Sequence, residues 1–168
     1  GKPKGVMIEH INLANFVNPN PKNGETLGFV ERGSVCLAMA AMTFDVSIME
    51  EFISLTNGLT VVIASDEEIL NPLMLGELII KNKVDIMATT PTYVSNIIDL
   101  PQLKKAISQI KVFDFGAEAF PPALYEKIRS VNSDAYIMNG YGPTEATISC
   151  TMKVIDNNKK ITIGIPNA

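Results

Sequence analysis

Short apolar runs alternate with helical stretches along most of this chain, and no other feature constrains its fold as strongly. Runs of strand length occupy 35–40, 59–64, 85–89, 110–115 and 135–138. Helical periodicity marks 10–17, 46–56, 72–82, 92–98 and 122–131. Strands that alternate with helices predict an α/β fold, in which helices cover both faces of a mostly parallel sheet. Residues 18–28, with two prolines, two glycines and three asparagines, are predicted to form a surface loop.

Composition bounds the protein class. The chain has 168 residues, 46% of them hydrophobic, and a net charge of −4, which suits a single α/β unit with a real core. The acidic balance argues against nucleic acid, and the absence of a bilayer-length apolar run argues against a membrane partner. Without a signal-peptide layout, the expected location is cytoplasmic. Cys36 and Cys150 lack metal or redox spacing and are interpreted as packing residues.

The segment 139–145, with the sequence NGYGPTE, has the composition of a nucleotide site. Its glycines and Pro143 form a turn where the run 135–138 ends, and ligands bind outside the carboxyl ends of strands in open α/β sheets. Tyr141 is free to stack on a purine, Thr144 offers a hydroxyl, and Glu145 offers a hard carboxylate for Mg²⁺. The alternative is an ordinary loop whose Thr-Glu pair caps the next segment.

Four further segments accompany this one in a fixed order: 1–5 (GKPKG), 44–47 (FDVS), 113–119 (FDFGAEA) and 163–167 (IGIPN). The opening segment suits phosphate because it is a basic, glycine-flanked turn before a helix, but it lacks the spacing of a P-loop, so taken alone it favours a solvated basic terminus. Asp45 opens a helix whose apolar positions 48, 52, 53 and 55 are expected to face the core. An aspartate at the N-cap or in the first turn also stabilises a helix, because its carboxylate accepts helix N–H groups and complements the helix dipole.

Taken together, these segments resemble the central part of an adenylation domain of a nonribosomal peptide synthetase, in the adenylate-forming, AMP-binding superfamily. The resemblance spans residues 1 to 167. It implies the large N-terminal subdomain of such an enzyme, with the first half of the phosphate loop and the C-terminal subdomain outside the chain. We therefore expect a single fragment, 1–168, of an ATP-dependent ligase, and we expect that fragment alone to be inactive.

The resemblance implies a role for each residue of the nucleotide site. Thr144 would hold the α-phosphate and Glu145 would hold Mg²⁺, which makes these two the expected catalytic residues. Tyr141 would stack on the adenine of ATP or AMP. Contacts to the nucleotide are expected from Lys2, Lys4, Gly116, Ala117, Glu118, Asn139, Gly140, Tyr141, Gly142 and Thr144. The single histidine, His10, is interpreted as a surface residue.

The resemblance also implies an amino-acid pocket in which Asp45 pairs with the α-ammonium of the substrate, since a buried charge needs a partner. The remaining wall is expected from Val46, Met49, Ala88, Phe113, Phe115, Gly140, Ile148 and Ser149. All of these except Ser149 are apolar, so the sequence predicts an apolar amino acid. Phe113 and Phe115 fit equally well as core residues of an alternating strand.

The implied reaction joins ATP and an amino acid into an aminoacyl adenylate, which is then loaded onto the phosphopantetheine thiol of a partner carrier-protein domain. A free-standing D-alanyl carrier-protein ligase shares these motifs. So does an acyl-CoA or aryl-acid ligase, although Asp45 argues against both. A non-catalytic scaffold that only binds nucleotide is the third alternative.

Overall fold

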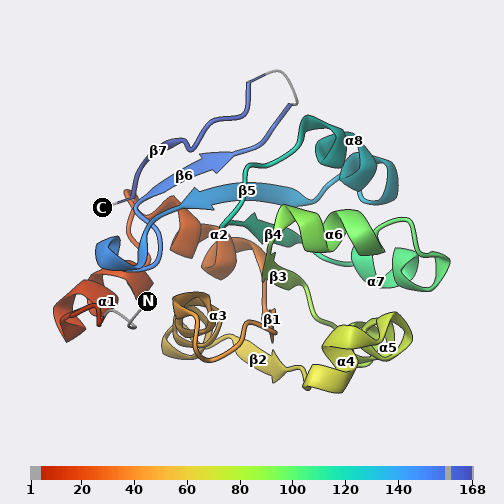
Figure 1. Ribbon diagram of the computed structural model, residues 1–168, viewed down its shortest axis with the longest axis horizontal. Helices are drawn as coiled ribbons and strands as arrows, with labels where there is room; N and C mark the ends of the chain where they lie inside the picture. Colours follow the sequence, from red (N-terminus) through yellow and green to blue (C-terminus); the bar gives the residue numbers. More distant parts are fainter. Residues whose placement is uncertain (1–4, 158–159, 168) are drawn as a thin grey trace.

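Within the described residues, 5–157 and 160–167, seven strands form one sheet in the order β2-β1-β3-β4-β5-β6-β7 (Figure 1). We describe it from a computed structural model. Strands β1 to β5 pair in parallel, whereas β6 and β7 are antiparallel. The strands are β1 (Val35–Ala38), β2 (Thr60–Ile63), β3 (Ile86–Thr89), β4 (Val112–Phe115), β5 (Tyr136–Tyr141), β6 (Thr151–Val154) and β7 (Ile165–Pro166). The predicted α/β fold with a mostly parallel sheet is confirmed.

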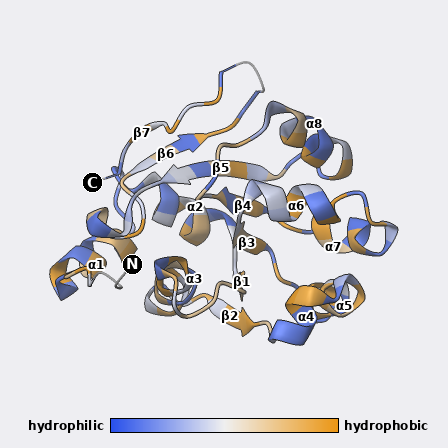
Figure 2. Cartoon of the chain, viewed as in Figure 1, coloured by the Kyte–Doolittle hydropathy of each residue, from blue (hydrophilic) through white to orange (hydrophobic). Residues whose placement is uncertain are grey.

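Helices cover both faces of this sheet. They are α1 (His10–Val17), α2 (Gly24–Arg32), α3 (Asp45–Thr56), α4 (Asp66–Leu70), α5 (Pro72–Asn82), α6 (Pro91–Ile97), α7 (Lys104–Ser108) and α8 (Pro122–Val131), with short 3₁₀ turns η1 (Pro101–Leu103) and η2 (Thr144–Ala146). The helices carry hydrophobic and hydrophilic residues on different sides, as Figure 2 shows. None of the helices in the described ranges is long and apolar enough to cross a membrane.

Successive strand residues divide between two apolar clusters, one on each face. Leu37 and Met87 belong to the cluster formed with α5 to α8, whereas Cys36 and Ile86 belong to the cluster formed with α1, α2 and α3. This division follows from the period of two in a strand. In β4 the first cluster takes Phe113 and Phe115, so Asp114 points to the face of α2 and α3.

Two sequence-based expectations about local structure are wrong. Residues 24–32 form helix α2, not part of a loop, because the Asn23 side chain accepts the Thr26 N–H at 3.2 Å and so caps a helix. Gly28 suggested a loop, but it is needed for close packing: a Cβ there would lie 2.5 Å from the Met138 sulfur. Strand β5 also runs on to Tyr141, which places Gly140 inside the strand and not in the turn after it.

Helix α3 also differs from expectation. Of the four apolar positions predicted to face the core, only Ile53 is buried, while Ile48, Phe52 and Leu55 are exposed. The buried side carries Met49 and Glu50 instead. The sequence pattern predicted the wrong buried side of α3, because a glutamate is buried at a position that an apolar residue normally fills.

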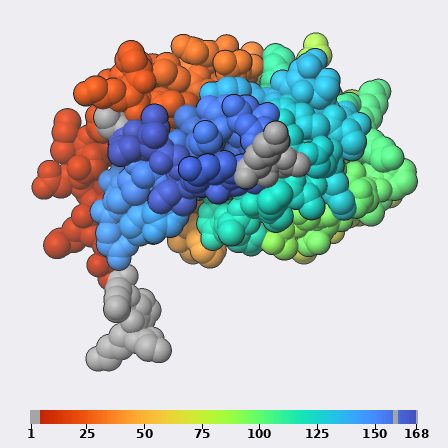
Figure 3. Space-filling model, turned by 90° about the horizontal axis from the view of Figure 1, so that it is seen from above, coloured from red at the N-terminus to blue at the C-terminus, as the bar shows by residue number. Residues whose placement is uncertain are grey.

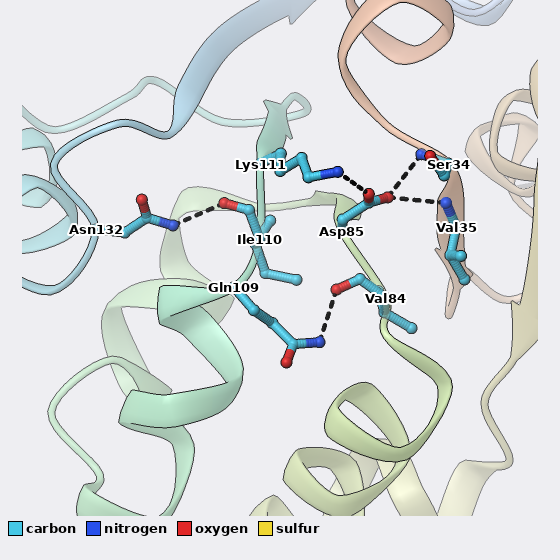
Figure 4. A network of polar contacts seen from close by, with 8 residues as sticks. All are labelled: Ser34, Val35, Val84, Asp85, Gln109, Ile110, Lys111 and Asn132. Carbon is cyan, nitrogen blue, oxygen red and sulfur yellow. Dashed lines mark hydrogen bonds and ion pairs between the residues drawn. The ribbon is translucent and has the colours of Figure 1, made fainter.

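The amino ends of the central strands are joined by side-chain hydrogen bonds to backbone atoms (Figure 4). Asp85 Oδ1 accepts the Ser34 and Val35 N–H groups, each at 2.8 Å. Gln109 donates to the Val84 carbonyl and Asn132 donates to the Ile110 carbonyl. These bonds fix the strands at the sheet edge opposite to the one where a ligand is expected.

Candidate functional site

A cavity of about 380 Å³ opens at the carboxyl ends of β1, β3, β4 and β5. This is the edge of an open α/β sheet where ligands usually bind. Each neighbouring segment contributes to the wall: 39–41 after β1, 44–46 and 49–50 around the start of α3, 88–90 after β3, 114–117 after β4, 140–142 at the end of β5, and 148–149 before β6. Glu25 reaches the cavity from α2. Residues far apart in the sequence therefore meet at one site.

Asp45 lies in this wall, half-buried, as the first residue of α3. Phe44 occupies the N-cap position and no side-chain cap bond is formed, but Asp45 lies in the first turn of α3, where its charge complements the helix dipole, so the helix-stabilising alternative stays open. Among the described residues the Asp45 carboxylate has no hydrogen-bond or ion-pair partner. Val46 and Met49 line the cavity beside it. An acidic group next to apolar side chains is suited to an ammonium on an apolar stem.

The other predicted wall residues divide into two groups. Ala88, Gly140, Ile148 and Ser149 line the cavity as expected. Phe113 does not: it is fully buried in the cluster on the opposite face, with its ring stacked on Phe115 at 5.7 Å between centroids.

Phe115 contributes to the cavity wall, but its ring packs edge-on against Phe120 in that opposite cluster. The two phenylalanines are thus core residues, which was the alternative interpretation. Phe113 is therefore absent from the apolar wall that the sequence predicted.

The cavity wall instead contains Asp114, the residue between the two phenylalanines. Asp114 is 3% exposed, and neither of its oxygens accepts a hydrogen bond from an N–H or hydroxyl of the described residues. The carboxyl group of Glu25 lies close to it and accepts a hydrogen bond from Asp114 when Asp114 is protonated. Burial raises the pKa of Asp114 well above its usual value, and the negative charge of Glu25 raises it further.

Glu25 is buried like Asp114, but its side chain has more hydrogen-bond partners. Its Oε2 accepts a hydrogen bond from the Asn167 side chain at 2.9 Å. Figure 3 shows the C-terminal segment that carries Asn167, in blue, beside the N-terminal helices in red and orange. Burial raises the pKa of Glu25, although the hydrogen bonds from its neighbours oppose this shift. Two adjacent buried carboxyl groups with raised pKa values are expected to share a proton.

Glu50 is the third buried acid of the wall. Its Oε2 accepts the N–H groups of Met39 and Ala40 at 3.1 and 3.0 Å and so holds the segment after β1 against α3. Its Oε1 has no partner among the described residues. Burial raises the pKa of Glu50 to about 7, despite the two backbone hydrogen bonds that favour the charged form.

The segment 139–145 reaches the cavity through three of its residues. Gly140, Tyr141 and Gly142 line it, and the Tyr141 ring is 52% exposed. Gly142 is required by close backbone packing, since a Cβ would lie 2.6 Å from the Ile148 carbonyl oxygen. Thr144 and Glu145 follow on the exposed turn η2. The tyrosine ring, the hydroxyl and the carboxylate are therefore accessible to a ligand.

Other residues predicted to contact the nucleotide have side chains that are engaged elsewhere. The Asn139 amide donates to the Thr162 carbonyl at 3.0 Å, and Glu118 accepts the Thr92 N–H at 3.1 Å; neither residue lines the cavity. Gly116 and Ala117 do line it. Lys2 and Lys4 lie outside the described residues.

Sequence reasoning missed Glu25, Glu50 and Asp114. Asp114 could have been found, because a strand that buries Phe113 and Phe115 on one face must turn the residue between them to the other. Glu50 could have been found as well, since it follows Val46 by one helical turn. Glu25 gave no signal, because its helix was interpreted as a loop. Within the described ranges no three acidic, cysteine or histidine side chains form a metal cluster.

Comparison with known proteins agrees with this architecture. The family model described as AMP-binding enzyme matches residues 1–168. Tyrocidine synthase 3 of Brevibacillus parabrevis is 32% identical over 169 residues, which cover 100% of this chain and 2% of that protein. D-alanine–D-alanyl carrier protein ligase of Bacillus velezensis is 31% identical over 98% of this chain and 33% of its own length.

Among solved structures, the nonribosomal peptide synthetase FmoA3 in its AMPPNP-bound form superposes with a TM-score of 0.85 and 22% identity, over 98% of this chain and 18% of that one. At that identity the likeness shows the fold. The chain spans at most about a third of the length of the two curated relatives. Because a single family model matches it from its first residue to its last, the chain belongs to the AMP-binding enzymes.

Proposed function

We propose that this chain is part of an adenylation domain that activates an amino acid with ATP. The carboxylate of the amino acid attacks the α-phosphorus, pyrophosphate leaves with the bonding electron pair, and an aminoacyl adenylate remains. The observation that carries the proposal is the Asp45 carboxylate, which has no partner among the described residues and lies in the wall of a cavity that residues 140–142 also line. A carboxylate at that place suits an α-ammonium group, which acyl and aryl acids lack.

The residues of the segment 139–145 then act mainly by positioning and by charge neutralisation, on which chemistry at phosphorus depends. The exposed Tyr141 ring stacks on adenine, and the Thr144 hydroxyl donates a hydrogen bond to an α-phosphate oxygen. Glu145 fits a magnesium site as a hard, exposed carboxylate, because Mg²⁺ is usually held by one or two carboxylates together with substrate phosphates. When bound, Mg²⁺ neutralises phosphate charge.

We further propose that the complete protein passes the activated amino acid to the phosphopantetheine thiol of a carrier-protein domain. The name of the relative from B. velezensis includes a carrier protein, which supports this step. The short share of each relative that the chain spans supports the interpretation that residues 1–168 are one part of a larger catalytic unit.

Amino-acid-dependent ATP–pyrophosphate exchange tests the proposal on the intact protein that contains this chain. We expect exchange with an amino acid and none with the same acid lacking its α-amino group. Asp45→Asn is expected to lower kcat/KM for the amino acid by about 100-fold, because a charge-assisted hydrogen bond contributes roughly 1.5–3 kcal/mol. Asp66→Asn is the matched control, since Asp66 is exposed on α4. Equal exchange with a deaminated acid would contradict the proposal.

The free-standing D-alanyl ligase remains a second candidate, because a relative with that name is as similar as the synthetases. Exchange specific for D-alanine would favour it. The scaffold alternative is tested by calorimetry of residues 1–168 with ATP and Mg²⁺, for which we expect binding without exchange. An absence of binding would contradict both the truncated enzyme and a scaffold that binds nucleotide, and would leave a bare folded scaffold.

A further inference from the structure

The cavity wall is acidic well beyond what an α-ammonium group requires. Glu25, Asp45, Glu50 and Asp114 all line it, whereas no lysine, arginine or histidine of the described residues does. Asp45 is already assigned to the α-ammonium of the substrate. Glu50 uses one oxygen to hold the Met39 and Ala40 N–H groups. Two carboxyl groups, Glu25 and Asp114, are left without a cation.

Asp114 lies in the wall of this cavity near the carboxyl end of β4, with both of its carboxylate oxygens buried. Its neighbours in β4, Phe113 and Phe115, turn their rings to the opposite face, which leaves Asp114 on the cavity side. It is 3% exposed and neither of its oxygens receives a hydrogen bond from a described N–H or hydroxyl. Buried polar groups in proteins are almost always hydrogen-bonded, so Asp114 must either share a proton with Glu25 or, when both are ionised, receive donors from a ligand.

Glu25 is placed beside Asp114 by two features of the chain. Asn167 holds its Oε2, and Gly140 gives the other oxygen room, since a Cβ at that glycine would lie 2.6 Å from Glu25 Oε1. Burying an unpaired charge costs several kcal/mol, and two adjacent carboxylates add mutual repulsion. A cation that enters between the carboxyl groups removes both costs and allows the pair to be fully ionised.

The rest of the wall fits the stem of such a ligand. Val46, Met49, Ala88 and Ile148 are apolar and line the same cavity. They would contact methylene groups, and the acidic pair would contact the end of the side chain. Long cationic side chains combine these two properties, since an aliphatic stem carries the charged head.

We infer that the cavity selects an amino acid whose side chain ends in an ammonium or guanidinium group, with its α-ammonium on Asp45 and its side-chain cation on Asp114 and Glu25. This inference rests on the proposed adenylation function and replaces the apolar substrate predicted from the sequence.

The test is ATP–pyrophosphate exchange by the intact protein with two sets of amino acids. The first set contains L-lysine, L-ornithine and L-arginine, and the second contains L-norleucine, L-leucine and L-phenylalanine. We expect one member of the first set to exceed norleucine in kcat/KM by at least about 100-fold, because a site with buried polar groups rejects an analogue that leaves them unpaired. Norleucine is the sharpest comparison, because it keeps the stem of lysine and lacks its ammonium group.

Asp114→Asn tests the assignment to this residue. The amide keeps the shape and removes the charge, so the preference for the cationic amino acid over norleucine should fall at least about 10-fold while the KM for ATP is unchanged. Glu25→Gln should act in the same direction. Glu31→Gln is the matched control, since it changes an exposed glutamate of the same helix α2 and should leave the preference as it was.

Two outcomes would overturn the inference. In the first, an apolar amino acid gives the highest kcat/KM; in the second, Asp114→Asn leaves the ratio of cationic to apolar substrate unchanged. Exchange that depends on an amino acid persists in both, so the proposed adenylation function survives them. Exchange with acids that lack an α-amino group, by contrast, would overturn the proposed function and this inference together.

Discussion

Two aspartates that are almost equally buried have opposite surroundings at the two ends of the sheet. Asp85, 6% exposed, lies just before β3 at the amino ends of the strands, and Asp114, 3% exposed, lies in β4 towards the carboxyl ends. Asp85 accepts two backbone N–H groups and pairs with Lys111 Nζ at 2.8 Å (Figure 4). Asp114 has no such donor in the part of the chain that the structure describes. A buried carboxylate with all its partners supports the fold, whereas one without them indicates a ligand.

The neighbouring residues extend this contrast. At the amino ends, Gln109 donates to the Ile79 and Val84 carbonyls, and Asn132 donates to the Ile107 and Ile110 carbonyls, so side chains satisfy the backbone where helices and strands meet. At the carboxyl ends the corresponding space is the cavity. The edge at the amino ends of the strands therefore stabilises the fold, whereas the edge at their carboxyl ends is free to accept a ligand.

The largest expected effect is on stability, from Asp85→Ala. The change leaves the Ser34 and Val35 N–H groups without their acceptor and removes the partner of Lys111. Hydrogen bonds to a charged group contribute about 1.5–3 kcal/mol each, so we expect a loss of about 4 kcal/mol in the free energy of unfolding. Urea unfolding followed by circular dichroism measures this loss.

Asp85→Asn is the matched control for that prediction. Its amide oxygen still accepts both backbone N–H groups, and only the ion pair is lost, so the cost should be about 1 kcal/mol. Equal losses from the two substitutions would show that charge, and not the backbone bonding, makes Asp85 important. The contrast with Asp114 would then need another explanation.

Much of the fold could be predicted from the sequence, because local patterns specify it. The helix over 72–82 begins at a proline and was predicted with its observed bounds, and the strand runs each contain or overlap an observed strand. Prediction failed where tertiary packing, and not the local sequence pattern, determines whether a segment forms a helix. Gly24 and Gly28 are typical of loops, yet here they allow helix α2 to approach Met152 and Met138 closely. The antiparallel strands β6 and β7 were not predicted, because no apolar run of strand length was identified in their sequence.

The site was predictable where a motif names its residues and less so where the fold brings residues together. Asp45 and the segment 140–142 lie at the cavity as the family resemblance implied. The prediction placed Phe113 in the cavity wall, where the structure has Asp114. Because side chains in a strand alternate between the two faces, an error of one position puts the wrong residue in the wall. The contribution of Glu25 depends on a contact with Asn167, 142 residues away, which no local pattern reveals.

Glu50, at the ligand end of the sheet, is expected to make stability depend on pH. Its pKa is raised from 4.5 to about 7, so the folded protein binds this proton more tightly than the unfolded chain does. The proton on Glu50 therefore stabilises the folded protein. Its contribution to the free energy of unfolding is fully present below about pH 4.5 and is lost as the pH rises through 7. A pKa shift of this size corresponds to about 3 kcal/mol in the free energy of unfolding. Glu50→Gln does not titrate and should lack this loss.

Unfolding free energies of both proteins between pH 5 and pH 8 measure that effect. We expect Glu50→Gln to gain on the parent protein as the pH rises, by up to about 3 kcal/mol. Glu25 and Asp114 titrate in both proteins, so their contributions cancel in the difference. Parallel pH profiles would mean that Glu50 stays charged at its site without cost.

A smaller effect on stability is expected from Asp114→Asn, and it should have the opposite sign to that of Asp85→Ala. The amide removes a buried charge that has no cation beside it, so at pH 8 we expect a gain of roughly 1–2 kcal/mol in the absence of substrate. The raised pKa of Asp114 implies that this gain shrinks as the pH falls and the carboxyl group is protonated. A loss of stability like that of Asp85→Ala would place Asp114 among the residues that support the fold.

The smallest expected effect comes from Lys111→Met, which removes the cation from Asp85 and leaves both backbone hydrogen bonds. The Lys111 side chain is 60% exposed, and solvent screens such a pair, so the cost should be at most about 1 kcal/mol and should shrink in high salt. Unfolding at low and high salt measures it. If the cost is as small as expected, Asp85 is held chiefly by two N–H donors from the start of β1. Those backbone donors, which Asp114 lacks, are then what distinguishes the two aspartates. A cost near that of Asp85→Ala would instead make the cation the difference, and a substrate cation at Asp114 would then stabilise the ligand end of the sheet in the same way.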